Sequence, residues 1–235
     1  MSVQANHESV WREGGKQTQS SYNDGRSGRA AMNDEATFRD IYRENSWGDT
    51  ESRSGPGSTV FRTRLLRPAL VQLLRDLEIK SVLDAGCGDF NWMRLTDLSG
   101  ISYIGVDIVS EIVQRNCDRY SDFSRRFVCL NLTRDPLPGA DLLLCRDCLV
   151  HLSYSDIDRV LRQMWSSGAR YLLTTTFDAN ETNCDIATGG WRPLNMEKPP
   201  FSFPSPIRKL WDGPRADSSY PDKMLSLYDM QALSF

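Results

Sequence analysis

The chain has 235 residues and a formal net charge of −3, with 40% hydrophobic and 25% charged residues. These values are typical of a globular protein that buries a core without disulfides or metal ions as staples. The near-neutral charge argues against a nucleic-acid partner, which normally meets a basic stripe. No apolar run approaches the roughly 18–20 residues that span a bilayer, and the start of the chain lacks a signal-peptide pattern. We expect a cytoplasmic protein with no membrane partner, as a monomer or homodimer.

Three regions differ in their residue pattern. Residues 1–33 are polar without a hydrophobic period and predict a disordered tail. Residues 34–78 predict a helical cap, with helices over 36–45 and 59–77 on either side of a loop rich in Gly and Pro. Residues 79–235 then predict the main domain.

In that domain, short apolar runs alternate with segments of helical spacing. The runs predict strands over 81–84, 103–107, 126–131, 141–145 and 170–176, and the segments between them predict helices over about 91–98, 109–121 and 154–166. Five prolines between residues 193 and 206 exclude a long helix there, and 207–211 and 224–228 predict two closing strands that form an antiparallel pair. We therefore expect an α/β fold, a Rossmann-like three-layer sandwich with a mostly parallel seven-stranded sheet and one antiparallel edge strand.

The six cysteines indicate a reducing compartment and buried small side chains rather than a disulfide framework. Cys145 and Cys148 form a C-x-x-C pair, but a zinc site needs two more ligands and no second pair exists. We expect no metal.

A glycine turn follows the first predicted strand. Asp84 ends that strand and is followed by Gly86-Cys87-Gly88, where glycines permit a tight turn that predicts the start of a helix. Asp107 ends the next strand 19 residues after Gly88, the usual spacing for a carboxylate that binds both hydroxyls of a ribose. The turn and the two strand-end acids together predict a nucleotide-type cofactor site.

The same turn distinguishes between cofactors. A dinucleotide fingerprint needs a third glycine three residues after Gly88, and Asn91 stands there instead. Asp89 at the expected helix N-terminus would also repel a pyrophosphate. S-adenosylmethionine (SAM), which carries an amine and a ribose but no phosphate, fits better.

On these residues the chain resembles the class I SAM-dependent methyltransferases. Leu83 to Gly88 resemble their first motif and Gly105 to Asp107 their second, and a bacterial-type subgroup carries stretches like Cys145 to Leu152 and Trp191 to Asn195. The resemblance implies SAM as cofactor, S-adenosylhomocysteine (SAH) as product, and a small-molecule acceptor. The cofactor-binding residues that we expect are Trp47, Asp84, Gly86, Cys87, Gly88, Asp107, Ile108, Asn131, Leu132 and Arg146.

Within that set, the resemblance places Asp84, Gly86 and Gly88 around the methionine part, Asp107 on the ribose and Ile108 on the adenine. Asn131 stands where many members carry an acid for the adenine amine, and its amide oxygen could accept the same bond.

The candidate catalytic residues follow the fourth strand. An unperturbed imidazole titrates near neutrality, so His151 is the candidate general base for a hydroxyl acceptor. Asp147 lies four residues earlier and could orient the ring on one face of a helix. The acceptor residues that we expect are Asp147, His151, Trp191, Arg192 and Asn195.

Structural interpretations stay open beside these. His151 could cap a helix, and Asp147 could pair with Arg146. Trp191 could pack in the fold, and Trp47 could fasten the N-terminal helix to the core rather than act in a lid. The alternative functions are a non-catalytic cofactor-binding regulator and an NAD(P)-dependent reductase. A nucleic-acid methyltransferase is disfavoured because the Asn-Pro-Pro-Tyr type of motif is missing after the fourth strand.

Overall fold

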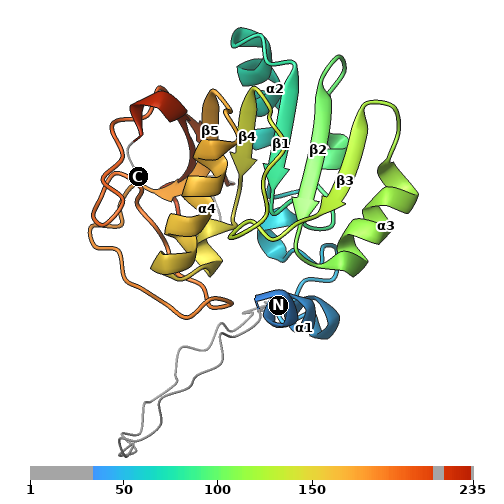
Figure 1. Cartoon of the computed structure of the whole chain (residues 1–235), viewed down its shortest axis with the longest axis horizontal. Helices are drawn as coiled ribbons and strands as arrows, with labels where there is room; N and C mark the ends of the chain where they lie inside the picture. The colour runs from blue at the N-terminus through green and yellow to red at the C-terminus, as the bar shows by residue number, and fades with distance from the viewer. Residues whose placement is uncertain (1–33, 214–219, 234–235) are drawn as a thin grey trace, which may run out of the picture. The chain divides into compact units, whose positions relative to one another are not determined.

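The computed structural model describes residues 34–213 and 220–233, so the predicted tail over residues 1–33 lies outside the described residues. A seven-stranded sheet with the order β3-β2-β1-β4-β5-β7-β6 forms the centre of the fold. In Figure 1 the strands β1 to β4 point their carboxyl ends toward helix α1. The strands are β1 Ser81–Ala85, β2 Ser102–Asp107, β3 Arg125–Cys129, β4 Leu142–Cys145, β5 Tyr171–Phe177, β6 Arg208–Trp211 and β7 Lys223–Asp229.

Strands β1 to β5 are parallel, and β7 pairs antiparallel with both β5 and β6. This confirms the predicted α/β fold with a mostly parallel seven-stranded sheet. The antiparallel strand lies one position in from the edge rather than at the edge. The physical reason is burial, because β7 carries the fully buried Leu225 and Leu227, whereas β6 exposes Arg208 and Lys209. Charged side chains protect an edge strand from further pairing.

Helices α1 Asp34–Glu44, α2 Leu66–Asp76, α3 Ser110–Tyr120 and α4 Tyr154–Ser166 surround the sheet. One hydrophobic core joins α2 and α3 to one face of the sheet, through residues such as Leu70 and Val113. A second core joins α4 to the other face, through residues such as Val160. In Figure 1, α4 lies in front of the sheet and α1 lies below the strand ends.

Two predicted helices differ from the structure. The helix expected over 59–77 begins only at Leu66, because Pro68 has no N–H and its ring would clash with the carbonyl of Arg64 in a longer helix. The helix expected over 91–98 is a single 3₁₀ turn, Met93–Leu95. Phe90 there adopts a left-handed φ of 59°, which is incompatible with an α-helix that starts at the glycine turn.

Because no α-helix begins after the glycine turn, the side chain of Asp89 does not lie at a helix N-terminus and instead binds a loop of the cap region. Its buried carboxylate accepts hydrogen bonds from the Ser52 hydroxyl at 3.0 Å, the Arg53 backbone N–H at 2.8 Å and the Ser54 hydroxyl at 3.3 Å. The Asn91 side chain also donates to the carbonyl of Ser58 at 3.1 Å. Residues 47–58, which we call the strap, are therefore fastened to the turn after β1.

We expect Asp89→Ala to lower the free energy of unfolding by about 2–3 kcal/mol, because it leaves several buried donors without an acceptor. Urea unfolding at neutral pH measures this change, and amide exchange of the strap should accelerate. The matched control is Asp158→Ala, which removes an exposed pair with Arg162 on α4 and should cost under about 0.5 kcal/mol. Equal losses in the two variants would contradict the fastening role of Asp89.

Candidate active site

A cavity of about 1030 Å³, including its open mouth, lies at the carboxyl ends of β1, β2 and β4. Residues from α1 and the strap line its outer side, and the strand ends line its floor. Each of the ten cofactor-binding residues expected from the sequence lines this cavity, and so do Asp147 and His151. The ten are Trp47, Asp84, Gly86, Cys87, Gly88, Asp107, Ile108, Asn131, Leu132 and Arg146.

The glycine turn has the backbone that the sequence required. Gly86 and Gly88 have φ values of 79° and 57°, in the left-handed region that favours glycine. A Cβ atom at Gly88 would overlap the hydroxyl of Ser54, and one at Gly86 would lie 3.0 Å from the sulfur of Cys148. The buried Asn116 on α3 donates to the carbonyl of Gly88 at 2.7 Å and fixes the far side of the turn.

Asp107 extends from the end of β2 toward this turn. Its two carboxylate oxygens each accept one backbone N–H at 3.0 Å, from Gly88 and Val109. Each oxygen keeps a second lone pair, so both can still accept a hydroxyl from a bound diol. Burial raises the pKa of Asp107, and the backbone donors of Val109 and Gly88 act against that increase.

Asp84 is buried at the end of β1, where the Tyr103 hydroxyl donates to its carboxylate at 2.6 Å. Burial raises the pKa of Asp84 to about 7, and the bond from Tyr103 acts in the opposite direction. A cation placed beside Asp84 would restore its ionised form. The site therefore favours a ligand with a positive group at this end.

Ile108, Asn131 and Leu132 lie around another part of the cavity. The amide oxygen of Asn131 already accepts from the Thr133 backbone N–H at 2.9 Å and the Thr133 hydroxyl at 2.7 Å. These two bonds use both lone pairs of that oxygen. The expected bond from an adenine amine to the Asn131 oxygen would therefore have to displace Thr133.

Four buried or half-buried charges meet after β4. Arg146 donates to both carboxylate oxygens of Asp212 within 3.2 Å and to the strap carbonyl of Gly57 at 2.8 Å. Lys223 Nζ lies 2.6 Å from Asp147 and 3.0 Å from Asp212. We call Arg146, Asp147, Asp212 and Lys223 the charge cluster.

The charge cluster fixes the ionisation of Asp147 and Arg146. Burial alone would raise the pKa of Asp147, but the charges of Lys223 and Arg146 outweigh it and lower that pKa. Burial likewise favours neutral Arg146, yet the charges of Asp212 and Asp147 raise its pKa. Asp147 is thus a permanent carboxylate at neutral pH.

His151 lies on the 3₁₀ turn Leu149–His151 rather than on a helix with Asp147. Its Nδ1 bonds to the carbonyl of Gly190 at 2.8 Å. Because a carbonyl only accepts, Nδ1 carries the proton and Nε2 of the neutral ring is left as a base. Gly190, not Asp147, is therefore the partner that orients Nδ1.

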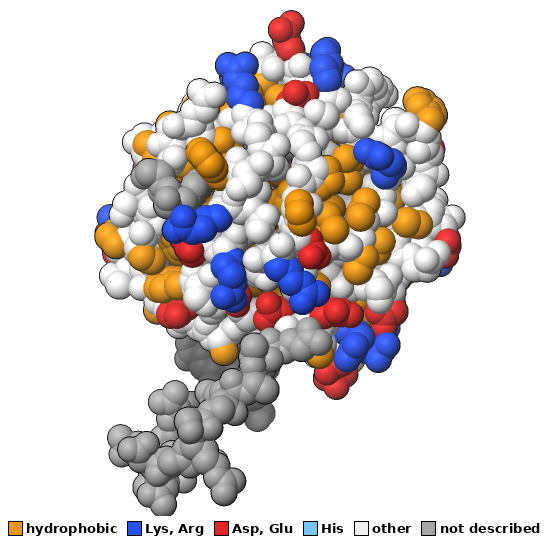
Figure 2. Space-filling view, in the orientation of Figure 1, with side chains coloured by type: hydrophobic (Ala, Val, Ile, Leu, Met, Phe, Trp, Pro, Cys, Tyr) orange, Lys and Arg blue, Asp and Glu red, His pale blue; other side chains and the backbone are white. Residues whose placement is uncertain are grey.

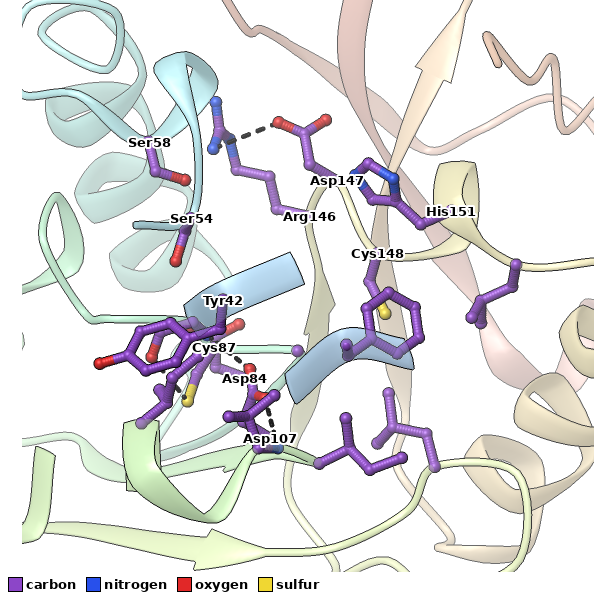
Figure 3. Close-up of a pocket in the computed structure, with 18 of the residues that line it drawn as sticks. Tyr42, Ser54, Ser58, Asp84, Cys87, Asp107, Arg146, Asp147, Cys148 and His151 are labelled. Carbon is purple, nitrogen blue, oxygen red and sulfur yellow. Dashed lines mark hydrogen bonds and ion pairs between the residues drawn. The ribbon is translucent and has the colours of Figure 1, made fainter. Parts of the chain in front are cut away.

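The surroundings of His151 keep its ring neutral. Burial lowers its pKa, while the Gly190 bond and the charge of Asp147 act in the opposite direction. The ring of Trp47 covers it at a centroid distance of 5.0 Å. Figure 3 shows Asp147 and His151 close together in one part of the pocket, with Asp84 and Asp107 grouped in another.

Three acceptor residues expected from the sequence do not line the cavity. Trp191 packs against Phe177 and Tyr220. Arg192 is buried and donates to the carbonyls of Cys184, Leu149 and Leu152, and Asn195 donates to those of Asp178 and Asn180. Arg192 and Asn195 therefore hold the loop after β5 in place rather than face the cavity, which corrects their predicted contact.

Sequence reasoning missed several residues of the site. Phe38 and Tyr42 of α1 line the cavity, and Asp212 and Lys223 complete the charge cluster. The apolar face of the predicted helix over 36–45 contained Phe38 and Tyr42, but nothing local indicated which surface it covers. Asp212 and Lys223 carry no local motif, and only the pairing of β5 with β7 brings Lys223 near Asp147.

Within residues 34–213 and 220–233, no cluster of three or more His, Cys, Asp or Glu side chains could hold a metal ion. None of the helices described is long and apolar enough to cross a membrane. On the face shown in Figure 2, basic and acidic side chains lie interspersed rather than gathered by sign.

Comparison with known proteins adds a family match over part of the chain. Residues 82–167, from β1 to the end of α4, match the family model of a methyltransferase domain. No curated protein sequence matches the chain.

Solved structures of methyltransferases share the fold. The 1,6-didemethyltoxoflavin-N1-methyltransferase of Burkholderia thailandensis, with bound 1,6-didemethyltoxoflavin and SAH, has a TM-score of 0.58 and 17% identity, covering 86% of this chain and 92% of that one. Magnesium protoporphyrin IX methyltransferase of Synechocystis PCC 6803, with bound SAM, has a TM-score of 0.57 and 16% identity, covering 85% of this chain and 99% of that one. The methyltransferase domain of bacterial CtHen1 has a TM-score of 0.53 and 14% identity, covering 72% of this chain and 99% of that one. The cofactor in the first two structures agrees with the cofactor predicted from the sequence.

We expect Asp84→Asn to change how stability depends on pH. The pKa of this carboxyl is about 7 in the folded protein and 3.8 in an exposed aspartate, so the folded wild type holds an extra proton between these pH values. Wild-type stability should therefore fall relative to the variant by about 1.4 kcal/mol per pH unit from pH 5 to 7, and no further above that. Urea unfolding from pH 5 to 8 measures the difference. Asp118→Asn on the exposed side of α3 is the control, and parallel curves for wild type and Asp84→Asn would contradict the assignment.

Proposed function

We propose that this chain is a class I SAM-dependent methyltransferase that methylates a hydroxyl group of a small molecule, with His151 as general base. The observation that carries the proposal is the cavity, where the glycine turn, Asp84 and Asp107 lie together under the strap. The methyltransferase-domain match over residues 82–167 and the fold shared with SAM-bound structures support it.

The residues of the cavity fit SAM in their chemistry. Asp84 would bind the ammonium of the methionine part, and Asp107 would accept both ribose hydroxyls. SAM supplies an electrophilic methyl group on its sulfonium, so the protein mainly has to bind and align the two substrates. Trp47 and the strap, on the outer side of the cavity, would exclude water.

The same geometry argues against a dinucleotide cofactor. A pyrophosphate normally binds at the N-terminus of a helix that opens right after the glycine turn. Here that helix is replaced by a 3₁₀ turn which begins only at Met93, and Asp89 is bonded to the strap. The backbone N–H groups of Gly88, Asp89 and Asn91 donate to side-chain oxygens instead of pointing at a ligand, which disfavours the reductase alternative.

His151 is suited to remove the proton of a hydroxyl acceptor. Its Nδ1–H is held by Gly190, which leaves Nε2 as the basic nitrogen, and burial keeps the ring neutral at pH 7. In the proposed reaction the acceptor oxygen attacks the methyl carbon, the carbon–sulfur bond breaks, and Nε2 takes the hydroxyl proton. Asp147, held ionised by Lys223 and Arg146, would stabilise the imidazolium that forms.

Calorimetric titration with SAM tests the cofactor assignment, and no binding at high micromolar concentration would refute it. We expect Asp107→Ala to weaken SAM binding roughly 10- to 100-fold, because the variant loses charge-assisted bonds to the ribose. Asp97→Ala removes an exposed carboxylate that pairs with Arg75 and should bind SAM like the wild type. Unchanged affinity in Asp107→Ala would contradict the ribose assignment.

Formation of SAH in the presence of phenolic and aliphatic alcohols tests the base. We expect His151→Gln to lower kcat by roughly 10²- to 10⁴-fold while SAM affinity stays within about twofold. In the wild type, kcat should rise as pH passes the lowered pKa of His151, below 6.5, and stay level above neutrality. A variant that keeps full kcat, or a wild-type kcat that falls as the pH rises from 5 to 7, would overturn the role of His151.

A further inference from the structure

Three aromatic rings meet at the carboxyl end of β5. Phe177 is buried, whereas Trp191 and Tyr220 each keep 43% of their surface exposed. The rings of Trp191 and Tyr220 lie 5.0 Å apart at 54°, and both meet Phe177 nearly edge-on, at 6.0 Å and 5.4 Å. We call Phe177, Trp191 and Tyr220 the aromatic corner.

The aromatic corner adjoins the wall of the cavity on two sides. Phe177 is the register partner of Lys223 on the neighbouring strand, and Lys223 Nζ lies 2.6 Å from the carboxylate of Asp147. Trp191 directly follows Gly190, whose carbonyl binds Nδ1 of His151. The corner is thus joined through one residue to each of the two proposed acceptor residues of the cavity.

The backbone around Trp191 is held rigidly. Gly189 N–H donates to the carbonyl of His151 at 2.8 Å, and Arg192 N–H donates to that of Val150 at 3.2 Å. The buried guanidinium of Arg192 adds bonds to the carbonyls of Leu149 and Leu152. A ligand that binds against Trp191 would therefore pay little ordering entropy for this loop.

We infer that the aromatic corner is the acceptor subsite and that it binds a planar, uncharged aromatic alcohol. This inference rests on the proposed function and names its substrate class. Exposed aromatic rings on a rigid support offer flat faces to another ring, in offset-stacked or edge-to-face contact. Such faces would also attract a cation, but the carboxylates of Asp147 and Asp212 are already paired with Lys223 and offer it no counter-ion. Because the corner is one residue removed from Asp147 and from His151, we expect the hydroxyl of an acceptor that rests on Trp191 to approach these two residues.

The test compares two alcohols of the same carbon skeleton, 2-naphthol and decahydro-2-naphthol, by calorimetric titration of the full chain with and without saturating SAH. We expect 2-naphthol to bind about 3- to 10-fold more tightly. Trp191→Leu and Tyr220→Leu should bring the ratio of the two dissociation constants toward one, and Trp191→Phe should keep most of the difference. Trp165→Leu, an exposed tryptophan on α4, is the matched control and should leave the preference unchanged.

Equal binding of the two alcohols to the wild type, or an unchanged preference in Trp191→Leu and Tyr220→Leu, would overturn the inference. SAH titration of the same proteins separates this result from the proposed function. Wild type and all four variants should bind SAH alike, because none of the substituted residues lines the cofactor cavity. Absence of SAH binding would refute the proposed function, whereas the preference measured without SAH still tests the corner.

Discussion

The carboxylate of Asp89 joins the floor of the cavity, at the strand ends, to the strap on its outer side. It follows the glycine turn after β1 and binds the strap through Ser52, Arg53 and Ser54. The strap in turn carries Trp47 onto His151 and offers the carbonyl of Gly57 to Arg146. One buried acidic side chain thus sets the position of the cofactor turn, of the cavity cover and, through Arg146, of the charge cluster.

The sequence predicted the parts of the site that depend on local geometry. Asp84, Gly86, Gly88 and Asp107 lie at strand ends or in a tight turn, where backbone shape fixes the residue type, and all four line the cavity. The strands were predictable because both faces of a parallel sheet are buried, which leaves continuous apolar runs such as Leu142 to Cys145.

Tertiary contacts determined what the sequence could not predict. Helical spacing predicted a helix over about 91–98, but the left-handed Phe90 and the bond of Asn91 to the strap leave only a 3₁₀ turn. Asp212 and Lys223 come from distant strands and meet Arg146 and Asp147 only after the sheet has formed. Charged residues that act as partners over such distances carry no periodic signal.

The two candidate acid–base groups after β4 owe their opposite ionisation states to their neighbours. The positive charges of Lys223 and Arg146 outweigh the effect of burial on Asp147, so the pKa of Asp147 is lowered and its carboxylate stays charged. His151 has a carbonyl as its Nδ1 partner and Trp47 against its ring, so burial dominates and its pKa falls. The charge of Asp147 by itself would raise the pKa of His151, and burial of the ring outweighs it, so a carboxylate lies near a neutral imidazole at neutral pH.

The closeness of Asp147 to His151 has a consequence for where positive charge is located during the proposed turnover. SAM brings one positive charge on its sulfur, and SAH has none there. If Nε2 of His151 takes the proton of the acceptor, that charge is not lost but moves from the sulfur to the imidazole ring. Because that proton stays in the cavity, the net charge of the cavity is the same before and after methyl transfer, and the imidazolium lies within the electrostatic reach of the permanently ionised Asp147. SAH keeps the ammonium and ribose that Asp84 and Asp107 would bind, so the step that resets the charge of the cavity is the return of the proton from His151 to solvent.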